Sequence, residues 1–465
     1  MLMRNMTIAL RLGLLALCLA AGVGRAQFVE DSMWTGRYVR DFVYNYRNGY
    51  VIGMTEGNNA IFSIWCGRNS LESSVYAPLP LYVTYNATNN RVYCTHGHGY
   101  EDDSVLVADA IQVHRIKEMP LPGAWRPIWD SVSNRVYVAC GLENDVAVID
   151  CRTDSVIDRI RVGETPSALD INTRHRKLYV RNWDGESVSI IDLNTNHVIR
   201  TIPVGGVPMA GLYHQGADKY YAGATGATSL VVIDGIGDTV LSRLPMPNTN
   251  LNAMAAAGPT GLLLVGLVVG EVDSVFAIDP ANDSVVHRVA VGRQPEAIVW
   301  SSYTGHFYVA CAVSDVVQVL SGDGSRVLAT LEVGGYPKVL ASAPEYHRVY
   351  VGHSDGSYVY VIKDSVTGIE EPLGPRAARR ELQAWPNPFR NSVRFDAASG
   401  NGEPAFRVYA LDGRLVARVE AGVTSSGLMA VWDGRSFDGA DAPPGVYFVT
   451  AVSPPQQSLT VVKIE

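Results

Sequence analysis

The amino-acid sequence predicts an all-β protein, in which an eight-bladed β-propeller is followed by a small Ig-like β-sandwich. The first observation behind this prediction is a tyrosine that recurs at intervals of about 42 to 44 residues, the length of one propeller blade. The second is a proline about 13 residues ahead of that tyrosine in five of the repeats. The positions are Tyr50, Tyr93, Tyr137, Tyr179, Tyr221, Leu264 (in place of Tyr), Tyr308 and Tyr350, and Pro80, Pro166, Pro208, Pro295 and Pro337.

One repeat, from Val162 to Gly205, shows the predicted blade most clearly. It contains four short apolar or alternating segments, SALDI, KLYVRN, SVSIID and HVIRTIPV, and turn-forming residues separate them. A chain of 465 residues is too long for one ordinary core. A repeat architecture avoids that limit because it grows by adding units.

Residues 1–26 are predicted to be a secretory signal peptide. Arg4 and Arg11 lie before and at the start of the apolar run LGLLALCLAAGV, and small residues precede a cleavage point ahead of Gln27. The run is too short to span a bilayer, and we expect no transmembrane segment in the mature chain. We therefore expect an exported protein, located outside the cell or on its surface.

The propeller is predicted over residues 27–364. Repeats begin near Arg37, Leu79, Leu121, Val162, Val204, Leu244, Val291 and Val333. The last repeat lacks a clear fourth strand, and an unclosed ring would leave two sheet edges unpaired. We expect the segment FVEDSMWT, ahead of the first repeat, to supply the missing strand. Seven blades remain the alternative if the degenerate first repeat is not a blade.

The segment LYVRNWDGESVSIIDLNTNHVIRTIPVG resembles the repeat of the YVTN family of bacterial and archaeal β-propellers, and the likeness is best over residues 135–361. This resemblance implies a propeller at a bacterial surface or in the periplasm. The biochemical role of the family is mostly unassigned, so the resemblance bears on architecture more than on activity.

A linker is predicted over residues 365–381 and a second domain over residues 382–465. This last part carries PNPF (386–389), YALDGRL (409–415), WDG (432–434) and GVYF (445–448). These motifs resemble the C-terminal sorting domain of type IX secretion cargo and the Ig-like domain of flagellar hook-capping proteins. The resemblance implies that the export machinery is a partner and that the domain sorts or anchors the protein.

Composition argues against several classes of function. The net charge of -8 and the pI of about 5.7 provide no basic surface, so we expect no nucleic-acid partner. The sequence contains no GxSxG, HExxH, phosphate-loop or CxxCH motif, and its tryptophans are not periodic. We therefore predict no catalytic residue and no cofactor. We also predict no disulfide among the five cysteines that follow residue 26.

Two patterns of polar residues suggest metal ligands at first sight. Asp150, Asp192, Asp234 and Asp279 each end a predicted third strand, but a turn follows each, and the aspartate side chain can cap that turn. His96 and His98, with Asp102 and Asp103 nearby, form the only cluster that resembles a metal site. A glycine-rich acidic turn explains the same residues, and we predict no metal.

A ligand site, if the propeller has one, is expected where the blades converge. The loops between blades and the loops between second and third strands share one face, and they carry candidate funnel residues: Glu164, Trp183, Asp184, Arg293, Tyr336, Lys338, His353 and Asp355. We expect a monomeric, exported binding or scaffold module for a protein, peptide or glycan. The alternative is a lactonase-like hydrolase, metal-assisted or not, in the central funnel.

Overall fold

The computed structural model describes residues 27–97, 101–247, 250–258, 261–269, 273–365, 383–385, 390–397, 405–410, 415–424, 427–437, 439–451 and 458–463. The predicted signal peptide, His98, almost all of the linker and the PNPF motif lie outside these residues. The chain divides into two compact units, residues 1–367 and 368–465, which are considered separately.

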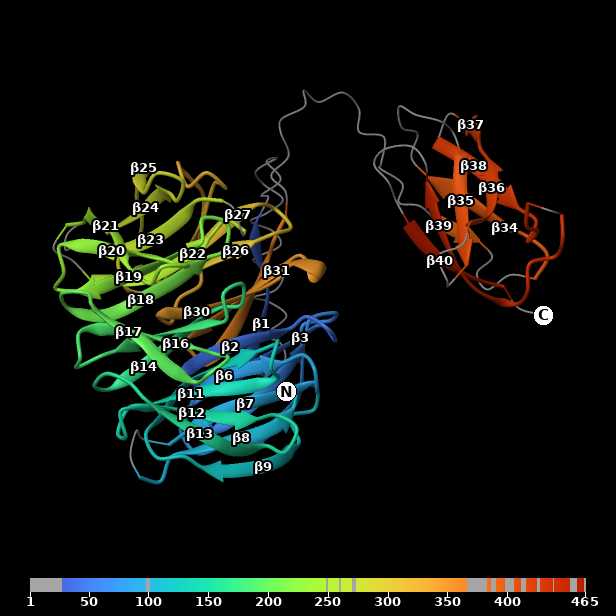
Figure 1. Ribbon diagram of the computed structural model, residues 1–465. Helices are drawn as coiled ribbons and strands as arrows, with labels where there is room; N and C mark the ends of the chain where they lie inside the picture. The colour runs from blue at the N-terminus through green and yellow to red at the C-terminus, as the bar shows by residue number, and fades with distance from the viewer. Residues whose placement is uncertain are drawn as a thin grey trace, which may run out of the picture. The chain divides into compact units, whose positions relative to one another are not determined.

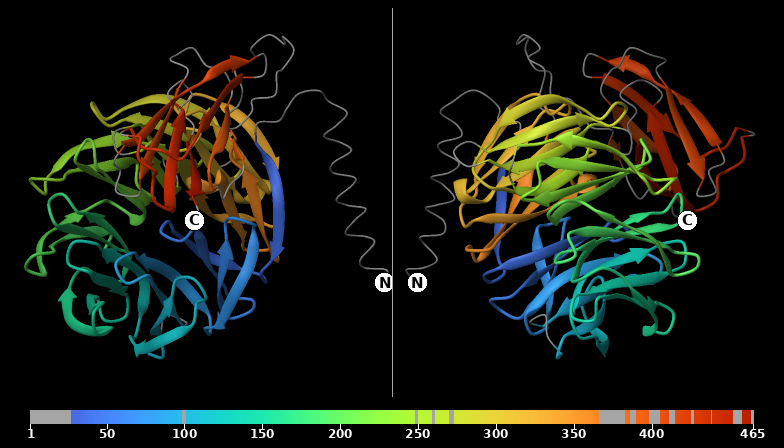
Figure 2. Two further views of the ribbon diagram at one scale, coloured as in Figure 1. Left: turned by 90° about the vertical axis from the view of Figure 1, so that its right-hand side faces the viewer. Right: turned by 60° about the vertical axis from the view of Figure 1, so that its left-hand side comes forward.

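Within the described residues, the first unit contains eight four-stranded antiparallel sheets that follow one another around a ring (Figures 1 and 2). Blade 1 is β2 (Val39–Asn45), β3 (Tyr50–Thr55), β4 (Ala60–Trp65) and β5 (Ser70–Tyr76). Blade 2 is β6 (Pro80–Asn86), β7 (Arg91–His96), β8 (Ser104–Asp109) and β9 (Arg115–Pro120). Blade 3 is β10 (Ala124–Asp130), β11 (Arg135–Cys140), β12 (Asp145–Asp150) and β13 (Ser155–Arg161). Blade 4 is β14 (Pro166–Asn172), β15 (Lys177–Asn182), β16 (Ser187–Asp192) and β17 (His197–Pro203).

The second half of the ring continues the pattern. Blade 5 is β18 (Val207–His214), β19 (Lys219–Thr225), β20 (Ser229–Asp234) and β21 (Val240–Pro245). Blade 6 is β22 (Asn250–Ala256), β23 (Leu263–Val268), β24 (Ser274–Asp279) and β25 (Ser284–Ala290). Blade 7 is β26 (Pro295–Ser301), β27 (His306–Cys311), β28 (Val316–Leu320) and β29 (Val327–Glu332). Blade 8 contains β30 (Pro337–Ala343), β31 (Arg348–His353) and β32 (Tyr358–Lys363). Two hairpin turns are short helices: η1 (Ala312–Ser314) between β27 and β28 of blade 7, and η2 (Pro344–Tyr346) between β30 and β31 of blade 8.

The ring closes as the sequence predicts. Strand β1 (Phe28–Trp34) pairs antiparallel with β32 and completes blade 8, from Phe28 opposite Lys363 to Trp34 opposite Tyr358. Figure 2 shows this strand, in blue, alongside the orange strands of the last blade. One edge of the Arg348 guanidinium donates to both carboxylate oxygens of Glu30, with Nε–Oε2 at 2.7 Å and Nη2–Oε1 at 3.0 Å. The prediction of eight blades is therefore confirmed, and the alternative of seven is not.

The hydrophobic core lies between neighbouring blades. The second and third strands of blade 4 are almost fully buried, whereas the outer strand β17 is mostly exposed. Tyr179 and Ile190 of blade 4 pack in one cluster with Tyr220 and Val231 of blade 5. Because each sheet is covered on both faces by its neighbours, its second and third strands are buried along their length, whereas the outer strand leaves most of its residues exposed.

The recurring tyrosine links each blade to the next one. Its hydroxyl donates to an Asp or Asn of the following blade, as in Tyr93 to Asp154 (2.6 Å) and Tyr221 to Asp283 (2.7 Å). Most of these acceptors occupy the left-handed position of the turn after the third strand, a conformation that Asn and Asp tolerate. The other pairs are Tyr137 with Asn196, Tyr308 with Asp364 and Tyr350 with Asn69.

Three blades lack this link. In blade 4 the buried Tyr179 hydroxyl donates to no Asp or Asn of blade 5 in the described residues, and in blades 6 and 1 an apolar contact takes its place. Leu264 replaces the tyrosine in blade 6, and the facing turn carries Gly324, where an added Cβ would lie 3.1 Å from the Leu264 side chain. Tyr50 of blade 1 packs in the same cluster as Val113, which takes the turn position in blade 2. Where the acceptor is lost, the contact becomes apolar.

We expect Tyr221→Phe to lower the free energy of unfolding by about 1–2 kcal/mol, because Asp283 then loses one of its donors in a half-buried site. Tyr50→Phe, which faces Val113, should change it by no more than about 0.5 kcal/mol. Urea unfolding of both variants compares the two effects, and equal losses would contradict a role for the hydrogen bond.

The second unit contains two four-stranded sheets within its described residues. One comprises β33 (Gln383–Trp385), β34 (Val393–Ala397), β38 (Gly427–Trp432) and β37 (Gly422–Thr424); the other comprises β36 (Leu415–Glu420), β35 (Ala405–Ala410), β39 (Gly445–Ala451) and β40 (Ser458–Lys463). They enclose one core that includes Phe395, Phe406 and Trp432. The Lys463 ammonium is buried and donates to Asp441 Oδ1 (2.6 Å) and to two carbonyl groups, so this lysine fastens the last strand to the loop after β38.

Candidate functional site

Two sets of loops share one face of the propeller because side-chain caps join them. An Asn or Asp from the hairpin between the second and third strands accepts the backbone N–H of the residue just before the next inner strand. Asn144 caps Thr165 N (2.7 Å), and Asp315 caps Tyr336 N (2.8 Å). The capped residues have positive φ, which lets the chain turn sharply from the rim to the axis. The predicted shared face is present.

Three predicted funnel residues lie together on blade 4. The Thr165 hydroxyl donates to Asp184 Oδ2 (2.5 Å), and the backbone of Trp183 and of Gly185 bonds the loop that carries Glu164. Trp183 is 41% exposed, and the Glu164 and Asp184 side chains are also exposed. These residues form a small solvated surface with one aromatic ring.

The other predicted funnel residues belong to blades 7 and 8. Arg293 is exposed, and the backbone of Asp355 bonds Gly335 in the loop that also carries Tyr336. Lys338 is half-buried on the inner strand β30. In an eight-membered ring, blades 4 and 8 face each other across the axis, so the structure does not bring the two groups of candidates into direct contact.

His353, the eighth candidate, is fully buried within blade 8. Its Nδ1 lies 3.0 Å from the carbonyl oxygen of Tyr358, and its ring packs edge-on against Tyr360. Burial lowers the pKa of His353 to about 4, so the imidazole is neutral at pH 7. The side chain packs beneath Gly335 and Gly356 of the loop face and has no solvent-exposed surface.

The metal-like patterns have structural partners. His96 is buried, and its Nε2 lies 3.1 Å from Glu118 Oε1. In the described part of the chain, no group of three His, Cys, Asp or Glu side chains could hold a metal ion. The four aspartates cap their turns as predicted: they accept backbone N–H groups from Arg152, Asn194, Ile236 and Ala281 at 2.8 to 3.2 Å. The five cysteines after residue 26 are free and buried.

The sequence analysis missed a cluster of charges on the inner strands, which we call the channel cluster. It consists of Asp41 on β2, Tyr82 on β6, Arg126 on β10, Asp170 on β14 and Arg181 on β15. The guanidinium carbon of Arg126 lies 4.3 Å from the centre of the Tyr82 ring, and Tyr82 also contacts Trp125. Four adjacent blades thus bring acids, bases and an aromatic ring to the inner wall.

Burial and mutual attraction compete in the channel cluster. Burial raises the pKa of Asp41, and the Arg126 charge opposes this rise. Burial also raises the pKa of Asp170, which Arg181 and the Tyr220 hydroxyl oppose. For Arg126, burial is the largest influence and disfavours the charged form, but Asp41, Tyr82 and Asp170 together outweigh burial and raise the pKa of the guanidinium. Arg126 therefore stays positively charged.

Arg181 and Asp170 are already engaged. Arg181 Nε lies 3.6 Å from Asp170 Oδ2, and Arg181 Nη1 donates to the carbonyl oxygen of Met209. Tyr220 donates to Asp170 Oδ2 at 2.9 Å. An added Cβ at Gly211 would lie 2.1 Å from the Tyr220 hydroxyl, so glycine is required for this close packing. This half of the cluster joins blades 4 and 5.

Arg126 is different. Arg126 is half-buried and hydrogen-bonds with the Tyr82 side chain, but among the described residues no carboxylate oxygen lies within 4.0 Å of its guanidinium nitrogens. Lys338 is the other cation on an inner strand for which the described residues provide no ion pair, whereas Arg40 on β2 is paired with Glu56. Arg126 and Lys338 are therefore the inner-strand cations without an ion pair in the described residues, and Arg126 lies over the Tyr82 ring.

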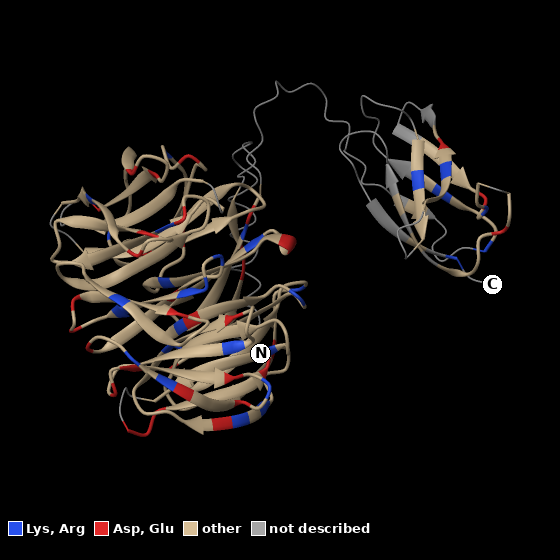
Figure 3. Ribbon diagram, in the orientation of Figure 1, with Lys and Arg blue, Asp and Glu red and all other residues tan. Residues whose placement is uncertain are grey.

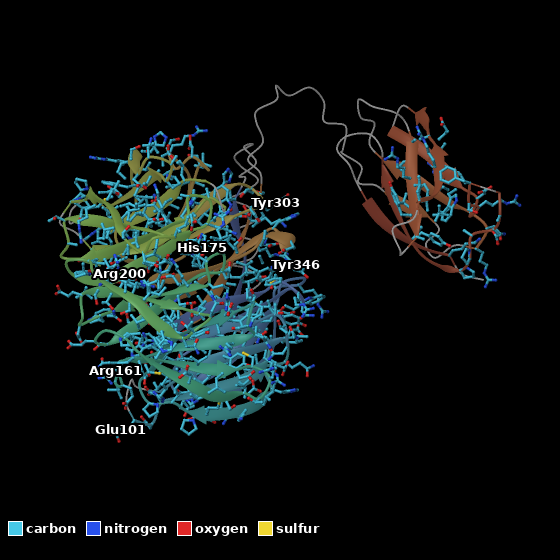
Figure 4. The ribbon with its side chains drawn as sticks, viewed as in Figure 1. Glu101, Arg161, His175, Arg200, Tyr303 and Tyr346 are labelled. Carbon is cyan, nitrogen blue, oxygen red and sulfur yellow. The ribbon has the colours of Figure 1, made fainter. Side chains whose placement is uncertain are left out.

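Charges elsewhere are mixed. In the view of Figure 3, lysines and arginines are interspersed with aspartates and glutamates over the propeller. Arg161 and Arg200 lie on the outer strands β13 and β17, far from the inner strands (Figure 4). No helix in the described residues is long and apolar enough to cross a membrane.

Comparisons with known proteins concern the fold alone. No family model and no curated protein matches the sequence. A structure of Kuenenia stuttgartiensis hydrazine synthase is similar with a TM-score of 0.49 and 13% identity, and it covers 71% of this chain and 96% of that one. A chain in a crystal structure of the mitotic checkpoint complex is similar with a TM-score of 0.50 and 13% identity, and the match covers 72% of this chain and 91% of that one. The YVTN and sorting-domain resemblances remain predictions.

Proposed function

We propose that this protein is an exported binding module whose propeller holds a carboxylate group of its ligand on Arg126. The observation that carries the proposal is the half-buried Arg126 guanidinium on an inner strand, which has no carboxylate oxygen within 4.0 Å among the described residues and meets Asp41 and Asp170 only at longer range. An arginine in this state is suited to bind a carboxylate through two parallel hydrogen bonds.

The surroundings of Arg126 favour one kind of anion. Tyr82 and Trp125 provide apolar surface beside the guanidinium, which suits the carbon chain of an acidic side chain or peptide end. Asp41 and Asp170 lie close enough to alter the pKa of Arg126, and their negative charges repel a dianion more than a monoanion. We therefore expect carboxylates to bind in preference to phosphate.

Calorimetric titration of the full chain with an N-acetylated Gly-Glu-Gly peptide tests this proposal, with inorganic phosphate for comparison. Arg126→Gln should weaken peptide binding roughly 10- to 100-fold, because it removes charge-assisted hydrogen bonds, and Arg126→Lys should weaken it less. Arg40→Gln, on the inner strand β2 of blade 1, is the matched control and should bind as the wild type does. Unchanged binding by Arg126→Gln would refute the site.

Export and anchoring form the second part of the proposal. It is supported by the sequence of residues 1–26 and by the separate C-terminal unit, whose described residues enclose their own core. Deletion of residues 382–465 should leave the propeller folded and change the location of the protein. Surface display of the shortened chain would argue against a sorting role.

A hydrolase remains the alternative function. The raised pKa values of Asp41 and Asp170 favour it, because they allow one of these carboxyl groups to act as an acid nearer to neutral pH. In the described hydrogen bonds, Asp170 accepts from the Tyr220 hydroxyl and Asp41 accepts from the backbone N–H groups of Phe42 and Val83. Turnover of a lactone or ester panel, abolished by Asp170→Asn, would replace the binding proposal.

A further inference from the structure

A cavity of about 290 Å³ lies where the ring closes. It separates the end of the closing strand β1 from the outer half of blade 1, and its lining includes Trp34 and Thr35 on one side and Asn58, Ser74 and Tyr76 on the other. Outer strands of neighbouring blades diverge with distance from the axis, so the side chains at this seam leave a groove. We call it the seam groove.

Two aromatic rings in the seam groove are unusually exposed. Trp34 is 58% exposed and Tyr76 is 63% exposed, although both belong to strands. Leu71, also in the lining, is 44% exposed. Aromatic side chains of this size normally bury most of their surface, and apolar surface that a folded chain leaves open often marks a binding site.

The polar part of the lining is rich in hydroxyl and amide groups. Thr35 is only 4% exposed, yet its hydroxyl oxygen has no hydrogen-bond partner among the described residues. Asn58 Nδ2 donates to the carbonyl oxygen of Thr35 (3.1 Å), and Ser74 lies across the groove. A buried hydroxyl without a partner is costly, and a ligand in the adjoining cavity can supply the missing hydrogen bond.

The lining contains no Lys, Arg, Asp or Glu. A charged ligand would lose its hydration there without gaining an ionic partner, so the groove is suited to a neutral one. A ligand with hydroxyl groups and flat C–H faces fits both halves of the lining, because its faces can stack on Trp34 and Tyr76 while its hydroxyls meet the amide and hydroxyl groups. A sugar ring has these properties.

We propose that the seam groove binds a neutral carbohydrate chain, at a site separate from Arg126. The bound sugar contacts β1 and blade 1 at once, so it joins the closing strand to the first blade. Binding to the folded state alone also raises the apparent stability of the ring as sugar is added. This inference goes beyond the proposed function and stands on different residues.

The experiment uses the full chain with cellohexaose, xylohexaose and hexa-N-acetylchitohexaose as probes, and binding is followed by titration calorimetry and tryptophan fluorescence. At least one hexaose should bind, and Trp34→Ala should weaken that binding at least tenfold. Thr35→Val, which keeps the side-chain shape and removes the hydroxyl, should weaken it about threefold to tenfold, as expected for one hydrogen bond. Circular dichroism and thermal melting establish that each variant is folded.

Trp183→Ala, which removes an exposed tryptophan from blade 4, is the matched control and should bind sugar as the wild type does. Arg126→Gln should also retain sugar binding, so that failure of the carboxylate site and failure of the seam groove can be told apart. Three results would overturn the proposal. They are no binding of any of the three neutral probes, wild-type affinity in the folded Trp34→Ala and Thr35→Val variants, and displacement of the bound sugar by an uncharged peptide.

Discussion

Removal of residues 27–35 is expected to abolish cooperative unfolding of the propeller. The deletion removes all six ladder partners of β32, the buried side chain of Met33 and the Glu30–Arg348 ion pair. Losing a buried methionine alone costs about 2–5 kcal/mol, and the lost ladder adds to it. It also exposes the edge of β32, which favours aggregation.

Addition of a synthetic peptide with the sequence of residues 27–36 should restore the ring in trans. Thermal melting and light scattering of the deleted chain, with and without the peptide, measure the rescue, and a scrambled peptide is the control. A deleted chain that melts cooperatively at the wild-type temperature would show that β1 is not needed for closure.

The propeller should lose stability on mild acidification because of His353. Burial lowers the pKa of this imidazole to about 4, whereas its value in the unfolded chain is near 6.5. Between these two values the unfolded state binds the proton and the folded state does not, so the free energy of unfolding falls as the pH falls from 6.5 to 4. The full loss from this residue is about 3 kcal/mol, and it is absent above pH 7.

Urea unfolding of the wild type and of His353→Gln at pH 7.0, 6.0 and 5.0 measures this contribution. The variant should show a smaller loss between pH 7.0 and 5.0, and the difference should reach about 2 kcal/mol. His114→Gln is the control, since that imidazole is largely exposed. If the free energy of unfolding changed with pH by the same amount in the wild type and in His353→Gln, His353 would not be the cause of the loss.

The propeller could be predicted because both sequence landmarks have local physical causes. The tyrosine recurs because its hydroxyl bonds the turn of the next blade, as Tyr221 does with Asp283. The proline recurs because it opens the inner strand, just ahead of a β-bulge, as between Pro166 and Ala168. Proline lacks a backbone donor and is tolerated at the first residue of a strand. The closing strand was predictable from the general cost of a free sheet edge.

The channel cluster could not be predicted in the same way. Arg126 and Asp170 lie inside strands, where sequence periodicity indicates burial but not which residues of other blades are near. Their proximity depends on four inner strands that are separated by about 42 residues each along the chain. Polarity and a shared face identify the loop candidates in the sequence. The caps at Thr165 and Tyr336 do produce that shared face. Polarity alone could not reveal that blades 4 and 8 stand on opposite sides of the axis.

The most direct test of ligand binding at the inner wall is a crystal structure of the full chain grown with the N-acetylated Gly-Glu-Gly peptide. We predict electron density for a carboxylate within hydrogen-bonding distance of the Arg126 guanidinium, with the peptide carbon chain against Tyr82. Density for the peptide elsewhere, with Arg126 turned to Asp41 or Asp170 in a direct ion pair, would contradict the proposed site.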